Sequence, residues 1–341
     1  MEHVAIDLGG RESHVCVRAL DGTIVDERPW PTARLGVYLK RRPASRVIVE
    51  TSAEAFAVAD RALEQGHEVR VVPATLVKSL GVGARGIKTD QRDARVLSEV
   101  SCRIDLPSVH VPSEASRSRK SMCGAREALV ETRTKLINTV RGWLRTQLLK
   151  IPSGTSATFP QRVRAKLLSD PNGMPAFIER PLRVIDELSE QIREADEELA
   201  QLAEHDETCR RLMTVPGVGA VTSVRFSAAL DDVGRFAGAH AVESYLGLTP
   251  GEDSSSTRKR RTGVTKAGSP RVRWALVQAC WAMRRSRPDD PLVQWSVQVE
   301  QRRGKLVAIV AMARKLAGIL YAMWRDGAAY DPHHEARRQQ T

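Results

Sequence analysis

Four acidic residues have the types and positions to bind divalent metal ions. Asp7 ends an apolar, β-prone run in the sequence VAIDLGG, and Glu50 ends a second one, RVIVE. Asp90 and Asp93 are three residues apart at the start of a helical pattern, so they share one helix face. Site residues of α/β sheets lie at the carboxyl ends of strands. Converging carboxylates repel one another unless cations lie between them, and oxygen ligands suit Mg²⁺ or Mn²⁺, which can catalyse phosphoryl transfer.

Taken one at a time, these acids have simpler explanations. Asp90 and Asp93 alone are typical of a helix N-terminus, where carboxylates cap free N–H groups and favour the helix dipole. Asp7 alone could cap the turn after its strand. The order of two strand-end acids followed by D-x-x-D at a helix start is more specific, and it predicts a metal-dependent catalytic site.

A serine triplet beside a basic run is the second candidate for chemistry. Ser254, Ser255 and Ser256 precede the sequence TRKRR. Composition alone favours a solvated loop, yet covalent phosphoryl transfer needs the same parts, a nucleophilic hydroxyl flanked by cations that hold a phosphate. The cations that we expect to contact a nucleic-acid backbone are Arg258, Lys259, Arg260, Arg261, Lys266, Arg271 and Arg273.

The charge of the chain favours a polyanionic partner. Its 341 residues include 53 Lys and Arg against 41 Asp and Glu, a net charge of +12, and such a balance is typical of proteins that bind nucleic acid. The turn PGVG contains Gly217 and Gly219 between two helical patterns. It could present backbone N–H groups to a phosphate, as in a helix-hairpin-helix, or be a tight packing turn. The sequence leaves both open.

Other features favour a soluble protein of the reducing cytoplasm, where binding to DNA would associate it with the nucleoid. The five cysteines are scattered and never spaced as C-x-x-C, which argues against a zinc knuckle or a disulfide framework. The N-terminus lacks the basic and apolar regions of a signal peptide. The apolar segment 306–324 is interrupted by Arg314 and Lys315, so we expect no membrane partner.

The first hundred residues are expected to form an α/β domain. Alternating and buried apolar runs predict strands at residues 3–8, 14–20, 23–28, 46–50 and 68–72. Asp21-Gly22 is a hairpin signal, and Gly66 ends a helix predicted at 53–65. An antiparallel meander followed by βα units is the order of a ribonuclease-H-like domain.

The remaining sequence is mostly helical in pattern. Apolar residues spaced alternately by three and four predict a short coiled coil or helical hairpin, within one chain or between two, formed by Ile185, Leu188, Ile192, Ala195, Leu199 and Leu202. We therefore expect an α/β domain at 1–110, a helical region at 111–208, a mostly helical C-terminal domain at 209–328 and a polar tail at 329–341.

These motifs together resemble the DEDD-type insertion-sequence transposases of the “IS-one-ten” family, relatives of the pilin-gene DNA invertases. The N-terminal part resembles them in AIDLG, VIVETS and KTDQRDARVL. The C-terminal part does so in LMTVPGVGAVTSVRFSAALDDVGRF, YLGLTPGEDSS, GVTKAGSPRVRWALVQA and AIVAMARKLAGILYAMW. One departure is that Ser256 and Thr257 follow the serine pair, where family members commonly have two glycines.

The resemblance implies a RuvC-like domain whose Mg²⁺ ligands fall on Asp7, Glu50, Asp90 and Asp93. It also implies a C-terminal transposase domain in which Ser254 or Ser255, with Ser255 favoured, attacks the DNA backbone and forms a phosphoserine link. Family members are understood to act as homodimers or homotetramers with composite sites. Many use a structured noncoding RNA to select target and donor DNA.

Three other functions fit parts of the sequence. A Holliday-junction resolvase would use the same acids with water as the nucleophile. An actin-like sugar kinase also begins with AIDLGG, but the sequence lacks its second Asp-x-Gly loop and a glycine-rich adenosine site. A non-catalytic nucleic-acid-binding protein would leave the acids unexplained. We therefore predict a Mg²⁺-dependent DNA transposase that moves its own element.

Overall fold

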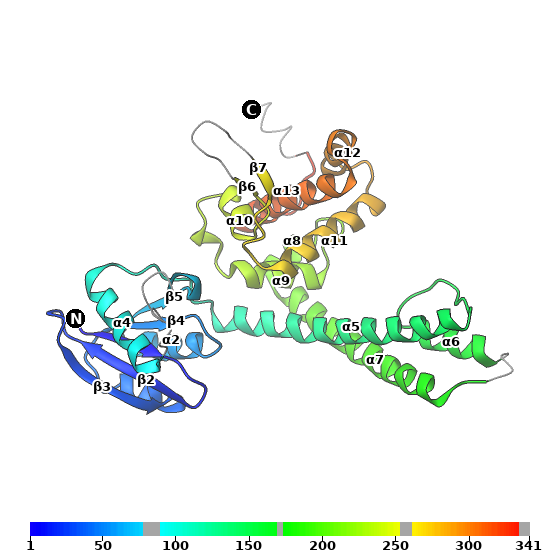
Figure 1. The fold of residues 1–341 in the computed structure, drawn as a ribbon. Helices are drawn as coiled ribbons and strands as arrows, with labels where there is room; N and C mark the ends of the chain where they lie inside the picture. The colour runs from blue at the N-terminus through cyan, green and yellow to red at the C-terminus, as the bar shows by residue number, and fades with distance from the viewer. Residues whose placement is uncertain (78–88, 169–172, 253–260, 334–341) are drawn as a thin grey trace. The chain divides into compact units, whose positions relative to one another are not determined.

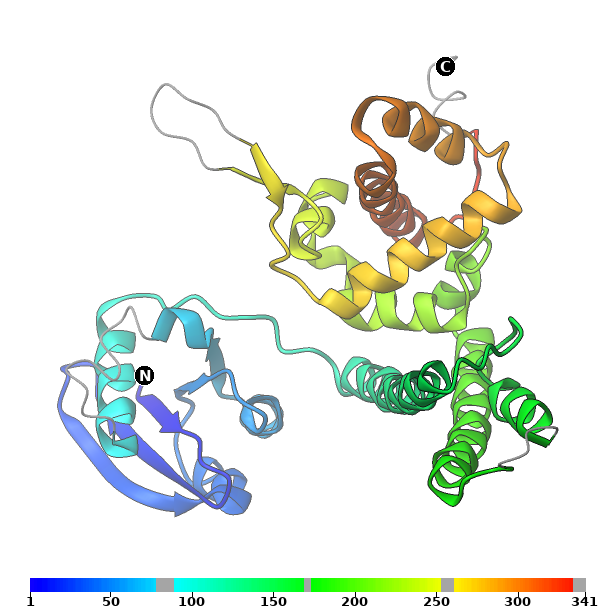
Figure 2. The same ribbon diagram turned by 45° about the vertical axis from the view of Figure 1, so that its right-hand side comes forward.

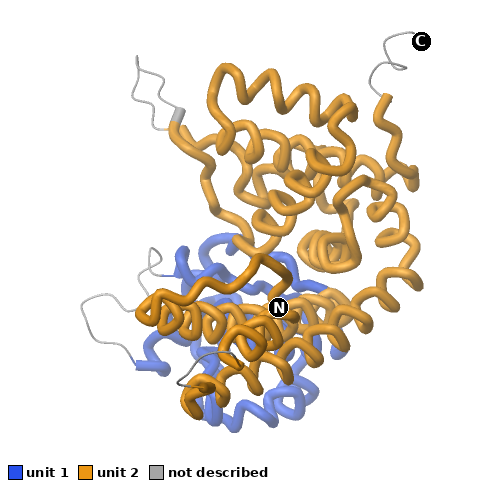
Figure 3. Tube along the Cα trace, turned by 90° about the vertical axis from the view of Figure 1, so that its right-hand side faces the viewer, with its two compact units in different colours: residues 1–112 blue, residues 113–341 orange. Residues whose placement is uncertain are grey.

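The computed structural model of the chain describes residues 1–77, 89–168, 173–252 and 261–333 (Figure 1). The chain folds into two compact units, residues 1–112 and residues 113–341, which Figure 3 shows in different colours. Each unit encloses its own hydrophobic clusters.

Within its described residues, unit 1 is built on a mixed five-stranded sheet. The strands are β1 (His3–Asp7), β2 (Glu12–Arg18), β3 (Ile24–Pro31), β4 (Arg46–Glu50) and β5 (Glu68–Val72), in the spatial order β3-β2-β1-β4-β5. The first three are antiparallel neighbours, whereas β4 and β5 run parallel to β1. The predicted strands are confirmed, although β2 begins earlier and β3 continues to Pro31.

Helices cover both faces of this sheet. Successive side chains of a strand point to opposite faces, and in β1 and β4 both sets are buried. The helices of unit 1 are η1 (Thr32–Arg34), α1 (Leu35–Leu39), α2 (Ala55–Glu64), α3 (Ala74–Val77) and α4 (Asp90–Arg103). Ile6 and Val49 belong to a cluster with α1 and α2. Ala5 and Ile48 belong to another with Leu97 of α4, so α4 lies on the second face.

Unit 2 is mostly helical in the part that the structure describes (Figure 2). Its elements are α5 (Glu114–Thr146), α6 (Phe159–Leu168), α7 (Ala176–His205), α8 (Glu207–Leu212), α9 (Ala220–Leu230), η4 (Val233–Arg235), α10 (Ala239–Tyr245), β6 (Pro250–Glu252), β7 (Arg261–Val264), α11 (Pro270–Ser286), α12 (Pro291–Arg303) and α13 (Lys305–Asp326). A mixed sheet in unit 1 and helices in unit 2 agree with the predicted combination of α/β and all-α parts.

The predicted apolar seam packs inside the chain. Of its residues, Ile185, Ile192 and Leu199 are buried, each seven residues after the last, and α7 lies against α5 as an antiparallel helical hairpin (Figure 1). An ion pair between Arg126 of α5 and Asp196 of α7, with Nε and Oδ1 2.8 Å apart, fixes their register. The seam thus forms a hairpin of one chain.

Helix α13 is the centre of the C-terminal core. It contacts α10, α11 and α12, and its buried residues include Met312, Leu316 and Leu320. By length and composition it is the one described helix that could cross a membrane, because Arg314 and Lys315 are too few to exclude a span. More than half of the span, 56%, is buried in the protein, as expected of a core helix.

The cysteines are all free thiols, and four of the five are buried. Cys16, Cys123, Cys209 and Cys280 are buried, and Cys102 is half-buried. Burial raises the pKa of every one of them, to about 11 for Cys209 and about 12 for Cys280. Because the thiolate is the nucleophilic form, a raised pKa lowers the reactivity of these side chains.

The PGVG turn packs directly on a helix backbone. Gly217 has a φ of +87°, and a Cβ built there would lie 2.4 Å from Ala279 O and 2.9 Å from Met283 N, both in α11. Only glycine allows this approach. Gly219 is different, because it is exposed at the start of α9 with no atom within 4 Å of a Cβ position.

Replacing Gly217 by alanine should therefore destabilise unit 2. The variant Gly217→Ala should lose about 2 kcal/mol or more of unfolding free energy, since both the φ and the contact with α11 become unfavourable. Calorimetry should show the melting temperature falling by about 4 °C or more. Gly219→Ala is the matched control and should melt within about 1 °C of the wild type. Equal shifts in the two variants would contradict the packing role of Gly217.

Candidate active site

Asp7 and Glu50 are neighbours at one edge of the sheet. In the parallel pair β1 and β4, Ile6 lies opposite Val49, so the next residue of each strand, Asp7 and Glu50, ends its strand beside the other. Both are half-buried. The chain leaves β1 through a tight turn in which a Cβ on Gly9 would lie 2.2 Å from Glu12 O. The glycine after the first acid thus lets β2 return directly beside β1.

Both acids lie on the face of the sheet that α4 covers. Ala5 and Ile48 are packed in the cluster that includes Leu97 of α4. Because side chains two residues apart in a strand point to the same face, Asp7 and Glu50 are on this face as well. The two predicted strand-end acids are therefore brought together, on the side from which α4 approaches.

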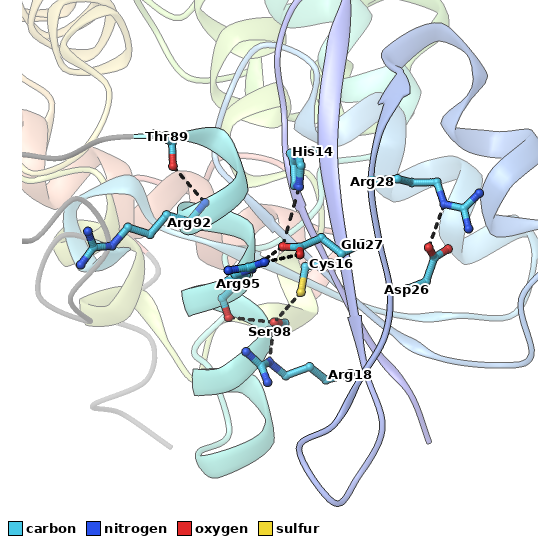
Figure 4. A network of polar contacts seen from close by, with 10 residues as sticks. All are labelled: His14, Cys16, Arg18, Asp26, Glu27, Arg28, Thr89, Arg92, Arg95 and Ser98. Atoms are coloured by element: carbon cyan, nitrogen blue, oxygen red, sulfur yellow. Dashed lines mark hydrogen bonds and ion pairs between the residues drawn. The ribbon is translucent and has the colours of Figure 1, made fainter.

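Helix α4 runs antiparallel to β1. Ser101 Oγ hydrogen-bonds with Nδ1 of His3, the first residue of β1, at 2.8 Å. One turn earlier, Ser98 Oγ donates to Sγ of Cys16, the cross-strand partner of Ala5, at 3.3 Å (Figure 4). One turn toward the N-terminus of α4 therefore corresponds to about two residues toward the C-terminus of β1. The first turn of α4 lies toward the Asp7 end of the strand.

The first turn of α4 carries the other two predicted acids. Thr89 caps the helix, its side chain accepting from Arg92 N at 3.3 Å. Asp93 is 2% exposed, whereas Asp90 is exposed. Among the described residues, Asp93 Oδ1 is buried without a hydrogen-bond partner. A buried carboxylate oxygen is costly unless a donor or a cation meets it, so this atom marks the place where a cation would be stabilising.

The four predicted carboxylates do not surround a common metal position in this structure. Within the described ranges of the chain, no group of three or more His, Cys, Asp and Glu side chains lies in a geometry that could hold a metal ion. The structure brings Asp7 and Glu50 together and directs the turn with Asp93 toward them. A bound cation would have to draw the carboxylates closer.

An ion pair between a half-buried acid and an exposed arginine, which no local sequence pattern predicts, anchors α4 beside this site. Arg95 donates to both carboxylate oxygens of Glu27 in β3, with distances of 2.5 and 2.6 Å (Figure 4). Nε2 of His14, which lies opposite Asp7, is 3.8 Å from Glu27 Oε1. Hydrogen bonds from Arg95 hold the pKa of Glu27 below its ordinary value. No local pattern links residues so far apart, so this contact cannot be predicted from a single sequence.

The predicted basic residues have different environments. Lys266 is exposed. Arg271 Nε forms an ion pair with Glu127 Oε2 at 3.1 Å. Arg273 donates to two backbone carbonyls, Leu246 O at 3.1 Å and Gly268 O at 2.5 Å, so it fixes the loop before α11. Arg273 thus has an internal structural contact in addition to its predicted role.

The serine pair falls between two short paired strands. Glu252 at the end of β6 lies opposite Arg261 at the start of β7. Several of the predicted residues lie outside the described ranges: Ser254, Ser255, Ser256, Arg258, Lys259 and Arg260. Their predicted roles stay predictions.

Two family models match the chain. A DEDD transposase model of IS110 type matches residues 4–148, and the model described as the transposase IS116/IS110/IS902 family matches residues 209–292. Together they cover more than half of the chain. These matches define a transposase, an enzyme that acts on DNA. The chain belongs to the IS110 family of DEDD transposases, as its motifs indicate.

Curated proteins similar to the chain are also transposases. The transposase for insertion sequence element IS1328 of Yersinia enterocolitica is 25% identical over 96% of this chain and 98% of its own length. A probable family 20 transposase of Pseudomonas aeruginosa is 28% identical over 91% of this chain and 92% of its own. The transposase for insertion sequence element IS1111A of Coxiella burnetii is 29% identical over 69% of this chain and 66% of its own length. DEDD transposases generally depend on a metal ion.

The Glu27–Arg95 pair should make part of the stability pH-dependent. Because the pKa of Glu27 is lowered in the folded state, the pair stabilises the fold above the ordinary Glu value of 4.5 and less as pH falls through the lowered value. Glu27→Gln should cost about 0.5–1 kcal/mol at neutral pH, since Arg95 is partly exposed, and less at pH 3 in urea denaturation. As a control, Glu99→Gln, which breaks the more exposed pair with Arg103, should cost less. A loss for Glu27→Gln that is equal at both pH values would contradict this role.

Proposed function

We propose that this transposase cleaves and rejoins DNA at a Mg²⁺-dependent site formed by Asp7, Glu50, Asp90 and Asp93. The observation that carries the proposal is the convergence of elements on one edge of the sheet. Parallel pairing of β1 and β4 sets two carboxylates side by side, and antiparallel α4 brings its first turn, with buried Asp93 and exposed Asp90, toward the same end of β1. Mn²⁺ could replace Mg²⁺, because both prefer oxygen ligands.

The residues present fit such an ion. The donors are all carboxylate oxygens, and Asp93 Oδ1 is buried without a partner among the described residues. When bound there, a divalent ion supplies charge stabilisation for the phosphate under attack and for the oxygen that leaves it. The protein's own contribution is to hold Asp7 and Glu50 on the strands and Asp93 on the anchored helix.

The fold proposed for unit 1 is RuvC-like and related to ribonuclease H. Its support is the strand order β3-β2-β1-β4-β5, with an antiparallel meander followed by two parallel strands. For residues 209–328 we propose a separate transposase domain with a helix-hairpin-helix-like turn at Gly217 and Gly219. The exposed start of α9 at Gly219 supports contact with a phosphate, whereas Gly217 is engaged with α11.

We further propose that Ser255, or its neighbour Ser254, is the nucleophile. Its Oγ forms a bond to phosphorus, the bond from phosphorus to a deoxyribose oxygen breaks, and the hydroxyl proton leaves as that oxygen is protonated. The reverse attack by a hydroxyl of another strand rejoins the DNA and frees the serine, so no external energy source is needed. Support comes from the motif and from the basic residues that follow it.

The partners follow from the family resemblance. We propose homodimers or homotetramers in which the acids of one subunit meet the serine of another, and a structured noncoding RNA that selects the DNA. A net charge of +12 supports binding of both nucleic acids. With such partners the protein would act in the cytoplasm at the nucleoid.

A trapping assay tests both halves of this proposal. Wild-type protein, element-end DNA, flanking RNA and Mg²⁺ should give a covalent protein–DNA adduct on a denaturing gel. The adduct should disappear in Asp93→Asn and in one of Ser254→Ala and Ser255→Ala, and persist in the control Ser256→Ala. Cleavage that needs Asp93 but neither serine, without an adduct, would instead assign a resolvase that uses water.

Metal binding can be measured independently of activity. Electron paramagnetic resonance of Mn²⁺ should show weaker binding in Asp7→Asn and Asp93→Asn. Asp105→Asn is the matched control, because its carboxylate pairs with Arg46 at the opposite end of β4. Unchanged Mn²⁺ affinity in the first two variants would overturn the proposed ligand set.

A further inference from the structure

The two long helices of unit 2 have opposite charges. Helix α5 has eight Lys and Arg against three Glu, a balance of +5. Helix α7 has three Arg against nine Asp and Glu, a balance of −6. Since the helices pack against each other, part of this charge is neutralised between them and part faces solvent.

The cations of α5 that face α7 are engaged within the protein. Arg119 NH2 lies 2.6 Å from Asp206 Oδ2, and Arg126 Nε lies 2.8 Å from Asp196 Oδ1. Arg133 NH1 donates to Ser189 Oγ at 3.3 Å. These contacts hold the hairpin together and leave little charge for an external ligand.

The outer face of α5 keeps its positive charge. Its exposed cations are Lys120, Lys135, Arg141 and Arg145, and the described part of the chain offers them no ion-pair partner. Arg141 lies over the Phe159 ring, 5.3 Å from its centroid, and keeps its charge. At 100° per residue, the four lie within about 120° of the helix circumference. Glu131 is an exposed acid in the same arc, so the exposed side chains of this face have a balance of +3. Glu127 also lies in this arc, but it is half-buried and pairs with Arg225 and Arg271.

The length of this face suits a nucleic-acid backbone. From Lys120 to Arg145 the helix rises about 37 Å at 1.5 Å per residue, close to one helical turn of B-DNA. Several phosphates lie within that length, because duplex DNA carries one charge for about every 1.7 Å of its axis. Separated cations along a rigid helix can each meet a phosphate without reading bases.

The outer side of α7 would repel the same ligand. Glu194, Glu198 and Glu204 are exposed, and among the described residues no cation pairs with them. The hairpin therefore has one face that attracts phosphates and one that repels them.

We propose that the outer face of α5, defined by Lys120, Lys135, Arg141 and Arg145, is a DNA-backbone contact surface of the enzyme. This inference rests on the chain acting on DNA and is independent of the proposed metal and serine.

Salt-dependent DNA binding by the full chain tests the surface. Fluorescence anisotropy with labelled element-end duplex in EDTA, over a series of KCl concentrations, separates binding from metal and cleavage. Lys135→Gln/Arg145→Gln should weaken binding at least about tenfold at low salt and reduce the slope of log affinity against log salt by about two. Glu131→Lys should tighten binding instead.

A control variant with the same change in net charge excludes a general effect. Arg285→Gln/Arg303→Gln removes two exposed cations of α11 and α12 and should leave the slope within about half a unit of wild type. Equal losses in both double variants, or an unchanged slope in the α5 variant, would overturn the proposal. So would a loss confined to structured RNA, because it would assign the face to that partner. Unchanged melting temperatures would show that the α5 variant remains folded.

Discussion

The parallel pairing of β1 with β4 is the constraint on which the site depends. Asp7 and Glu50 are far apart in sequence and become neighbours because Ile6 lies opposite Val49. A slip of one residue would turn one carboxylate to the opposite face, since side chains alternate along a strand. The buried clusters on both faces oppose such a slip, so apolar packing fixes the geometry of polar groups.

The second support is the way α4 is held on the sheet. Polar contacts occur along its length: Ser101 with His3, Ser98 with Cys16 and Arg95 with Glu27. Apolar contact through Leu97 alone would permit the helix to slide, whereas directional hydrogen bonds fix its position along β1. The buried oxygen of Asp93, which has no hydrogen-bond partner among the described residues, is thereby held in a place where the proposed cation would be stabilising.

The sequence predicted features that depend on local periodicity. The strands 46–50 and 68–72 are predicted with the observed bounds. The spacing of Ile185, Ile192 and Leu199 predicts a short coiled coil or a helical hairpin, within one chain or between two, and the structure has a hairpin within the chain. The sequence did not predict contacts between distant residues, such as Glu27 with Arg95 or Arg273 with the carbonyl of Leu246. These depend on which elements meet in three dimensions, and a single sequence has no local signal for that. The roles of the four acids and of the serine pair are still predictions.

The buried thiols have a practical consequence for spectroscopic work. Burial raises the pKa of all five native cysteines, so at neutral pH very little thiolate is present for a maleimide or a nitroxide reagent to attack. A cysteine introduced on an exposed helix surface would keep its ordinary reactivity and would be modified first. The four buried cysteines can therefore be kept when a single probe is introduced at a chosen position, whereas their replacement would leave cavities in the cores of both units, and half-buried Cys102 is the one native thiol to replace first.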